Sequence, residues 1–476
     1  MAILVSFYLI GLAILLAGYV LVQVVRGDEE LVSLRNFFIA GLIVFQITGP
    51  ALSIQAGDVG YFMPADLDSS SIKFGFMITV FTAIFLFTYK RSSGLLDKFY
   101  ARKAGDTTAY SPLGMLVIAG MSLGLGLFCQ YVLFYIPVLG PGFFKLAFGL
   151  YAIGAGLAAW TMAPRLMNPI YLFGGGSLIM VSAGLTFAGN FGRREILGVV
   201  LAILWAMYFS HWRNLGFKSV IARISVVCIG GLILLGLVTS ARSGDFREQS
   251  AMQNISTLKS ASAGEGVKEM LYGQRAGLNS MWLIESRPDS HDYDTLHTLK
   301  LMIGFPIPRA VWLNKPDALG ITMPKLEIKV PGKPKGWNIG PGIIGHIAND
   351  NPFIALWLYP IIIGFVFRIF DRAVMWFSTN PFVVLPMGAA IGQVIGMPRG
   401  ELGNFFFTAL LNVVAAFVIM RSISFVLSTI GWIKKVDQSW DDAYIEQEEE
   451  AWDAAHGWDE YQGQYGDGEE GYTAQR

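Results

Sequence analysis

The sequence predicts an all-α membrane protein with many transmembrane helices, and three observations support this class. The chain of 476 residues is 54% hydrophobic and only 15% charged, whereas soluble proteins carry roughly 25% charged residues. Its mean hydropathy is +0.51. Apolar stretches long enough for a membrane span, which takes about 20 residues as a helix, recur along the chain. Helices are expected because backbone polar groups in lipid must be satisfied within the segment.

We expect about eleven transmembrane helices, eight before a long polar insert and three after it. They fall near residues 3–25, 36–53, 74–89, 113–136, 143–163, 169–188, 196–211, 219–240, 352–370, 381–396 and 403–424. The first stretch has no basic leader and no small-residue cleavage site, so we interpret it as a retained helix. The 54 glycines suit close helix packing. Cys129 and Cys228 lie inside apolar stretches and are interpreted as packing residues.

The predicted organisation has four parts: transmembrane helices in 1–240, an outer loop domain at 241–351, further transmembrane helices in 352–435 and a tail at 436–476. From Asp437 onward the tail carries 13 acidic residues and a single basic one. The formal net charge of zero therefore hides a cationic body, with 34 basic against 22 acidic residues. We expect the tail to be a disordered, solvated segment, with a docking arm for a partner as the alternative.

Orientation follows from the charges of the short loops, because loops rich in Lys and Arg stay in the cytoplasm. The loop after the third stretch is basic and the loop before it is acidic, with Lys90, Arg91, Lys98, Arg102 and Lys103 against Asp58, Asp66 and Asp68. This asymmetry predicts a periplasmic N terminus and, after eleven crossings, a cytoplasmic C terminus. The polar insert then faces the periplasm.

Three arginines break this charge rule, because they lie in short connections on the predicted outer side. They are Arg193 and Arg194 before the seventh stretch and Arg399 before the last one. Cations placed there indicate an anionic ligand. The alternative is that their side chains extend to lipid headgroups.

The insert divides into a helical first part, up to about Lys300, and a proline-rich second part that begins at Gly304. Because proline removes a donor and fixes the backbone, the second part is predicted to be a rigid, extended loop. The loop is predicted to be electropositive, with Arg309, Lys315, Lys325, Lys329, Lys333 and Lys335 opposed by Asp317 and Glu327. Near the membrane end of the insert, Arg242 and Arg275 are candidate contacts for sugar or phosphate.

The chemistry indicated by these residues is the binding of a phosphorylated lipid without a metal. No Cys or His pair has metal-ligand spacing, and there is no phosphate-binding glycine loop and no nucleophile elbow. We therefore expect no cofactor and no metal, and no nucleic-acid partner. Arginine grips two phosphate oxygens at once and keeps its charge. At this location, the anion that fits best is the pyrophosphate of a polyprenyl-linked glycan.

An ordered set of motifs resembles a known family. The set comprises Gly192-Arg-Arg-Glu, Ile307-Pro-Arg-Ala-Val-Trp-Leu-Asn-Lys-Pro, Gly342-Ile-Ile-Gly-His-Ile-Ala-Asn-Asp-Asn-Pro and Pro398-Arg-Gly-Glu. In order and spacing it is similar to the O-antigen polymerase group, the Wzy-type oligosaccharide repeat-unit polymerases, and to the related O-antigen ligases. The resemblance covers roughly residues 185–425. It implies a GT-C-like, metal-independent, inverting glycosyltransferase at the periplasmic face of the bacterial inner membrane.

The resemblance also implies roles for individual residues. Arg193 or Arg194, Arg309 and Arg399 would hold the donor pyrophosphate, and Arg242, Arg275, Lys315 and Glu401 are further candidate substrate contacts. His346 would accept the proton of the attacking sugar hydroxyl, with Asp350, Glu401 or no base as alternatives, because many of these polymerases carry an acidic residue at this point. His346 could instead be a cap or interface histidine.

The implied partners are lipid-linked glycan donors and acceptors, membrane lipid and a chain-length regulator or other glycan-assembly protein. A glycan ligase, a lipid-linked sugar flippase or transporter and a non-enzymatic assembly scaffold are the alternatives. Transporters are typically built from inverted repeats with ionisable residues near the midplane. We find no such half-to-half similarity, and the charges gather at the predicted outer interface.

Overall fold

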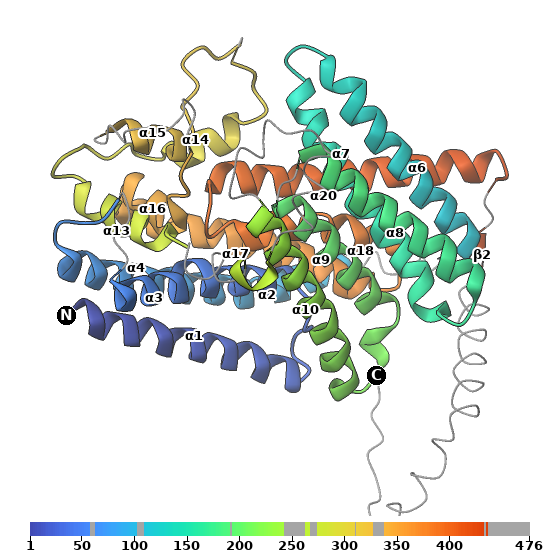
Figure 1. Ribbon diagram of the computed structural model, residues 1–476, viewed down its shortest axis with the longest axis horizontal. Coiled ribbons are helices and arrows are strands. Elements are labelled where there is room, and N and C mark those ends of the chain that lie inside the picture. The colour runs from blue at the N-terminus through green and yellow to red at the C-terminus, as the bar shows by residue number, and fades with distance from the viewer. Residues whose placement is uncertain are drawn as a thin grey trace, which may run out of the picture.

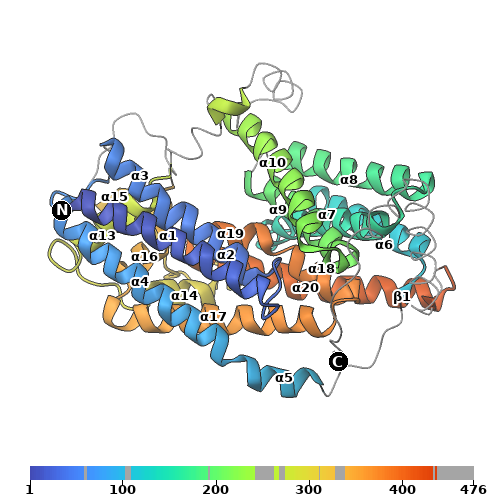
Figure 2. The ribbon, with the colours of Figure 1, turned by 90° about the horizontal axis from the view of Figure 1, so that it is seen from below.

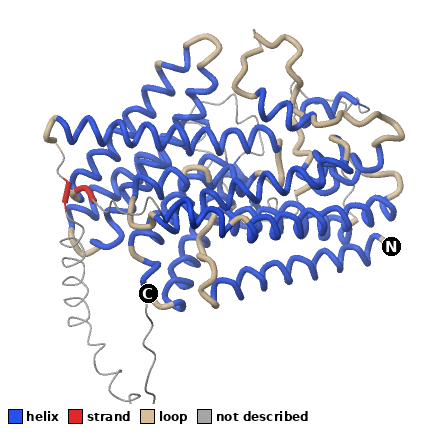
Figure 3. Tube along the Cα trace, turned by 180° about the vertical axis from the view of Figure 1, so that it is seen from behind, coloured by secondary structure: helices blue, strands red, loops and turns tan. Residues whose placement is uncertain are grey.

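The computed structural model describes residues 1–57, 62–101, 109–190, 193–241, 262–266, 274–309, 311–326, 338–432 and 435–436. This part is almost entirely helical (Figure 3). The two short strands, β1 (Ala109–Tyr110) and β2 (Lys435–Val436), pair antiparallel. They lie at the end of the molecule opposite the N terminus (Figure 3).

Before the insert, the described helices are α1 (Ala2–Val25), α2 (Leu34–Leu42), the π-helical η1 (Ile43–Thr48), α3 (Gly49–Ala56), α4 (Leu67–Arg91), α5 (Ser93–Ala101), α6 (Pro112–Tyr131), η2 (Leu133–Tyr135), α7 (Gly140–Met162), η3 (Ala163–Arg165), α8 (Pro169–Asn190), α9 (Arg193–Ser210), η4 (Trp212–Asn214) and α10 (Phe217–Ala241). The insert contributes α13 (Ala276–Ser286), α14 (His297–Gly304), α15 (Leu319–Leu326) and α16 (Gly342–Asn349). The chain then forms α17 (Pro352–Trp376), α18 (Pro381–Gly388), α19 (Ile391–Gly396) and α20 (Leu402–Thr429).

The protein is a polytopic membrane protein, as predicted. Among the described residues, nine helical segments are long and apolar enough to cross a bilayer: Ala2–Val25, Leu34–Ala56, Leu67–Tyr100, Pro112–Tyr135, Gly140–Arg165, Pro169–Ala188, Phe217–Ser240, Pro352–Trp376 and Leu402–Thr429. The other two predicted stretches also form helices, but these helices differ from an ordinary span. Helix α9 opens with the charged run Arg193, Arg194 and Glu195. The stretch 381–396 is divided between α18 and α19.

The insert helices lie at the same end of the molecule as the N terminus, and β1 and β2 lie at the other end (Figures 1 and 2). Helix α7 is the most enclosed of the nine segments. It packs against α6, α8, α9 and α20. The amino-terminal ends of α7, α9 and α20 come close to one another, because residues near all three ends line one pocket.

The expectation of an extended loop after Gly304 is wrong for α15 and α16. Helix α15 contains Pro324, which cannot donate to the carbonyl four residues earlier. That carbonyl belongs to Gly320, and it accepts the amide of Ile339 at 3.0 Å instead. The two amides at the start of α15 donate to Glu401, which comes from the start of α20. Long-range hydrogen bonds thus stabilise a helix that the local sequence disfavours.

A buried ionic cluster holds α2, α4 and α17 together at the end opposite the insert. Asp371 accepts the backbone amides of Leu34 and Arg35 at 2.8 and 3.1 Å and the hydroxyl of Tyr89 at 2.8 Å. Arg368 donates to Glu29 at 2.7 Å. Because charges taken out of water need partners, these contacts fix the positions of the three helices.

Candidate functional site

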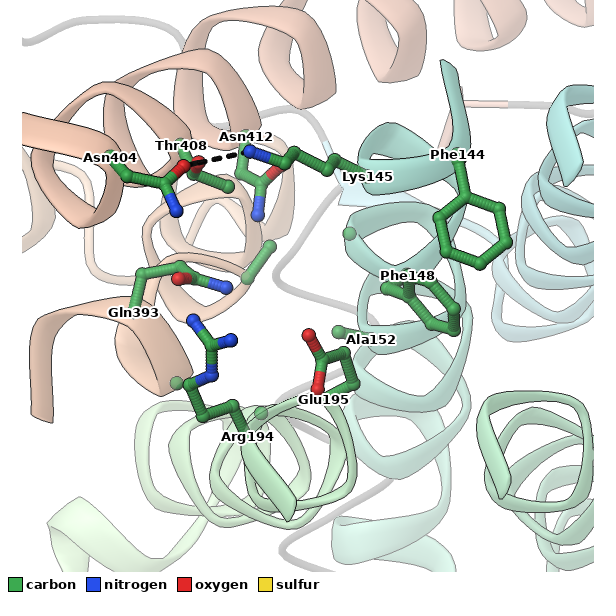
Figure 4. A pocket seen from close by; sticks show the side chains of 14 residues that line it. Phe144, Lys145, Phe148, Ala152, Arg194, Glu195, Gln393, Asn404, Thr408 and Asn412 are labelled. Atoms are coloured by element: carbon green, nitrogen blue, oxygen red, sulfur yellow. Dashed lines mark hydrogen bonds between the residues drawn. The ribbon is translucent and has the colours of Figure 1, made fainter. Parts of the chain in front are cut away.

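The described residues enclose a polar pocket of about 220 Å³ between α7, α9, α19 and α20 (Figure 4). On α7 it is lined by residues spaced three or four apart, which therefore share one helix face: Phe144, Lys145, Phe148, Gly149 and Ala152. On α20 the spacing is four, with Asn404, Thr408 and Asn412. Helices α9, α18 and α19 complete the wall with Arg194, Glu195, Gly198, Ala389, Gly392 and Gln393.

Two glycines bring α9 and α19 together at the edge of this pocket. A Cβ at Gly392 would lie 2.8 Å from the Cα of Gly198 and 2.9 Å from the carbonyl oxygen of Arg194. A side chain at position 392 would thus push the helices apart, because small residues are what allows helix backbones to approach this closely. The close approach places Arg194 and Glu195 opposite Gln393.

The pocket is cationic on one side. Lys145 donates to Oδ1 of Asn404 at 2.7 Å, and its Nζ lies 4.5 Å from the ring centroid of Phe305. The guanidinium of Arg194 lies 4.7 Å from the ring centroid of Phe405. With the described residues, Arg194 forms no hydrogen bond or ion pair. Stacking on an aromatic ring leaves the N–H donors at the guanidinium edge free for an anion.

Further polar groups in the pocket also lack protein partners. Glu195 and Gln393 form no hydrogen bond or ion pair with the residues that the structure describes. Oδ1 of Asn412 is buried without a partner in the same part of the chain, and this side chain is only 4% exposed. Figure 4 shows Arg194, Glu195 and Gln393 turned toward the same space. Because buried polar groups are normally satisfied, Oδ1 of Asn412 indicates a bound ligand or water. Arg194 is exposed and Glu195 and Gln393 are half-buried, so their polar atoms are accessible to a ligand.

The insert reaches the pocket through Phe305, whose ring lies 4.9 Å from that of Phe407. Nζ of Lys315 lies 5.2 Å from the centroid of Phe305. Lys315 also donates to the carbonyls of Phe305 and Ile307 at 2.8 and 2.9 Å. Partial burial, followed by the charge of Arg309, lowers the pKa of Lys315. Lys315 was predicted to contact the substrate, and its contact with Phe305 places it beside the pocket.

His346 lies inside α16 and is fully buried. Its Nδ1 is 2.8 Å from the hydroxyl of Thr298, and its Nε2 accepts the amide of Leu402 at 3.1 Å. Because Nε2 is an acceptor, the proton resides on Nδ1 and is donated to Thr298. Both ring nitrogens are thus used to join α16 to α14 and α20. This is the geometry of an interface histidine, which was the alternative interpretation of the sequence.

The two acidic residues considered as alternative bases are likewise occupied. Asp350 is fully buried, and its Oδ2 accepts the amide of Thr298 at 2.6 Å and the hydroxyl of Tyr359. The carboxylate of Glu401 is buried and accepts the amides of Leu319 and Gly320 at 3.0 and 2.9 Å. These carboxylates stabilise the amino ends of α14 and α15, where free N–H groups favour negative charge.

The predicted arginines do not all meet at one point. Arg309 is half-exposed and binds within the insert, to Asp317 at 2.6 Å and to the carbonyl of Lys315 at 3.0 Å. Arg399 is exposed, and its guanidinium lies 5.8 Å from the ring centroid of Phe45. The turn that carries Arg399 is tied to α16, because the amide of Ile343 donates to the carbonyl of Pro398 at 3.1 Å.

The remaining predicted arginines lie outside the pocket lining or outside the described side chains. Arg275 is half-buried at the start of α13. Arg193 is the first residue of α9, and its side chain lies outside the described part. Arg242 is outside the described residues. Of the arginines expected to bind substrate, the structure therefore places Arg194 in the pocket.

The sequence alone did not identify five residues of the pocket, namely Lys145, Glu195, Gln393, Asn404 and Asn412. One signal was present, because an ionisable side chain inside an apolar span marks a functional site by default, and Lys145 lies within such a span. A second signal was the spacing of four between Asn404, Thr408 and Asn412, which places them on one face of an apolar helix. The sequence of this helix alone does not show which neighbouring helix the polar face packs against.

No protein family, no curated protein and no solved structure matches this chain.

Proposed function

We propose that this protein is a glycosyltransferase that polymerises undecaprenyl-pyrophosphate-linked oligosaccharide repeat units into a surface polysaccharide, namely an O-antigen, a capsule or an exopolysaccharide. The observation that carries the proposal is the pocket in which Lys145 and Arg194 lie near the amino-terminal ends of α7 and α9. A substrate with a lipid tail, an anionic linker and a hydrophilic head fits this placement. The tail stays in the bilayer, and the linker meets the two cations.

The proposed topology has eleven crossings, with α9 and the α18–α19 pair as crossings beyond the nine long segments. The N terminus and the insert would face the periplasm of a bacterial inner membrane, and the C terminus would face the cytoplasm. Lys145 is five residues into α7 (Gly140–Met162), so it lies about 8 Å along the axis from the outer end at ~1.5 Å per residue. Arg194 is the second residue of α9. Both cations would then lie close to the level of the lipid phosphates.

In this proposal the chain's own cations stabilise the leaving pyrophosphate. Arg194 has the geometry for two parallel hydrogen bonds to phosphate oxygens, and Lys145 adds a point charge. Lys315 would approach from the insert. Negative charge develops on the leaving oxygen as the glycosidic bond breaks, and donors arranged in advance stabilise it by several kcal/mol (roughly 3–4 for one donor). Arg399 stays a candidate contact at the neighbouring turn.

The buried residues that join the insert to α20 have a supporting role in this proposal. His346, Asp350 and Glu401 hold α14, α15 and α16 against the start of α20. Phe305 follows α14 directly and contacts the pocket lysine. The three residues therefore position the insert over the site without touching the substrate.

The test is deletion of the gene in its host, followed by gel analysis of the surface glycan. A polymerase predicts loss of the long-chain ladder with single repeat units retained, and restoration of the ladder by the wild-type gene. Full-length chains left on the lipid carrier would instead identify a ligase. Lipid-linked units accumulating on the cytoplasmic face would identify a flippase or transporter. An unchanged glycan would contradict the proposal.

A further inference from the structure

Glu195 is the acidic residue among the 14 described residues that line the pocket, and nothing above assigns it a role. It follows Arg194 directly in α9, and its side chain is turned into the same space (Figure 4). It forms no hydrogen bond or ion pair with the residues that the structure describes. A carboxylate in this position can accept a proton or a hydrogen bond from a ligand.

The size of the pocket limits what it can hold. At about 30 Å³ for each water molecule, a volume of about 220 Å³ corresponds to roughly seven waters. The interior therefore has room for one sugar ring, and the exposed Arg194 lies on the open side, where the rest of a larger ligand can extend outward. The aromatic rings of Phe144 and Phe148 and the small residues Gly149, Gly198 and Gly392 line the same space. The pocket therefore suits a single, compact, partly apolar ring.

The polar groups of the pocket also decide what kind of ring fits. Oδ1 of Asn412 is a buried acceptor without a partner among the described residues, and the carboxylate of Glu195 accepts only. A fully ionised phosphate has no hydrogen to donate to either group, so phosphate is expected at the cations and not against these two acceptors. Sugar hydroxyls both donate and accept. The acceptors of this part of the pocket are therefore matched by a neutral polyhydroxyl ring.

From these observations we infer that the pocket is the acceptor subsite, which takes the terminal sugar of the incoming acceptor, and that Glu195 is the general base. This inference rests on the proposed function. The donor pyrophosphate would bind on the cationic side, at Arg194 and Lys145, and the acceptor ring would lie against Gln393, Thr408 and Asn412.

The bond changes in the step are balanced without a co-reactant. The acceptor hydroxyl gives its proton to the carboxylate of Glu195 as its oxygen bonds to the anomeric carbon of the donor sugar. The bond from that carbon to the phosphate oxygen breaks, and its electron pair leaves with the polyprenyl pyrophosphate beside Arg194. The protonated Glu195 then returns its proton to water or to the departing pyrophosphate.

Access favours Glu195 as the base over the acid–base residues of the insert and of the start of α20. His346, Asp350 and Glu401 are buried, and each is committed to backbone or side-chain partners within the protein. A base must come within hydrogen-bond reach of the hydroxyl whose proton it accepts. Among these four groups, Glu195 is the one that lines the pocket between α7, α9, α19 and α20.

The experiment uses the purified full-length protein in lipid nanodiscs, with lipid-linked repeat units extracted from the deletion strain. Glu195→Gln should lower the rate of dimer formation by about 10²–10⁴-fold, whereas binding of sugar-free undecaprenyl pyrophosphate should stay within about threefold of wild type. Added formate should restore part of the rate to Glu195→Ala. Asn412→Leu should weaken binding of the repeat unit and leave binding of the sugar-free lipid unchanged.

Two matched controls separate these effects from general damage. Glu265→Gln makes the same chemical change on an exposed residue of the insert, and Ser422→Ala removes a polar group from an exposed site on α20. Both should behave as wild type. The inference is overturned if Glu195→Gln forms dimers at a near-normal rate, or if it loses binding of the sugar-free lipid. Absence of dimer formation by the wild-type protein would instead count against the proposed function.

Discussion

The pocket between α7, α9, α19 and α20 and the insert helices α13 to α16 both hold charged side chains, but the two sets have different surroundings. In and beside the insert, His346, Asp350 and, at the start of α20, Glu401 are buried and paired within the protein. In the pocket, Arg194 and Glu195 have no hydrogen-bond or ion-pair partner among the described residues. A short polar motif can therefore have a purely structural role. Polar side chains that line a pocket without a protein partner indicate a ligand-binding site instead.

Arg309 and Arg194 show the same difference for one residue type. Arg309 and Arg194 are both exposed, but Arg309 is engaged with Asp317. Arg194 stacks on Phe405 and presents its donors to the pocket. Both arginines were expected to bind pyrophosphate, and the geometry separates them. Substitutions in the two regions should therefore have different consequences.

The largest effect is expected for Arg194→Ala, because it removes a donor from the developing negative charge of the leaving group. We expect the rate of polymer formation per folded molecule to fall by about 10²–10³-fold. Arg194→Lys should retain part of the activity, since it keeps the charge and loses the two-pronged contact. The measurement is ladder synthesis in the complemented deletion strain, normalised to membrane protein level. A wild-type ladder from Arg194→Ala would remove this residue from the site.

A smaller effect, on stability and not on chemistry, is expected for His346→Ala. The substitution leaves the buried amide of Leu402 without its acceptor, which costs about 1–3 kcal/mol, and a cavity adds to this loss. The thermal unfolding midpoint in detergent should therefore fall. Molecules that stay folded should keep a specific activity within a few-fold of wild type. Loss of activity with an unchanged midpoint would restore His346 as a catalytic candidate.

Glu401 and Glu285 provide a matched pair for the same comparison. Each carboxylate accepts two backbone amides, Glu401 from Leu319 and Gly320 and Glu285 from Ala65 and Asp66. Glu401 is buried and Glu285 is partly exposed. Glu401→Gln should therefore lower the free energy of unfolding by about 1.5–3 kcal/mol, and Glu285→Gln by less. Equal losses in thermal unfolding would show that burial of Glu401 adds nothing.

The smallest effect is expected for Arg309→Ala. Its ion pair with Asp317 joins two half-exposed side chains, and exposed pairs contribute about 0–1 kcal/mol. Ladder synthesis should stay within about threefold of wild type, far from the loss expected for Arg194→Ala. An absent ladder with normal protein level would place Arg309 back in the pyrophosphate site.

Much of the fold could be predicted because a membrane helix is determined by a continuous run of apolar residues in the sequence. Each of the eleven predicted stretches lies on helix in the structure, and the apolar composition alone requires this in lipid. Helix α15 could not be predicted in the same way. Its stability depends on Glu401 and Ile339, which are distant in the sequence, so the local signal of Pro324 was misleading.

The site was predicted only in part, for a related reason. The charged turns that were predicted to face outside identified Arg194, and the cationic insert identified Lys315. Glu195, Gln393 and Asn412 became visible when the helices were placed side by side, because each is an ordinary polar residue on its own helix. His346 was chosen for its chemical versatility, but the packing of α16 against α14 and α20 uses both of its nitrogens.

The most direct test of the central claim is the affinity of the purified protein for undecaprenyl pyrophosphate in nanodiscs, compared between Arg194→Ala and Arg309→Ala. Our account predicts at least a tenfold loss, about 1.4 kcal/mol, for Arg194→Ala and an affinity within about threefold of wild type for Arg309→Ala. The opposite pattern, with binding lost in Arg309→Ala and kept in Arg194→Ala, would contradict it.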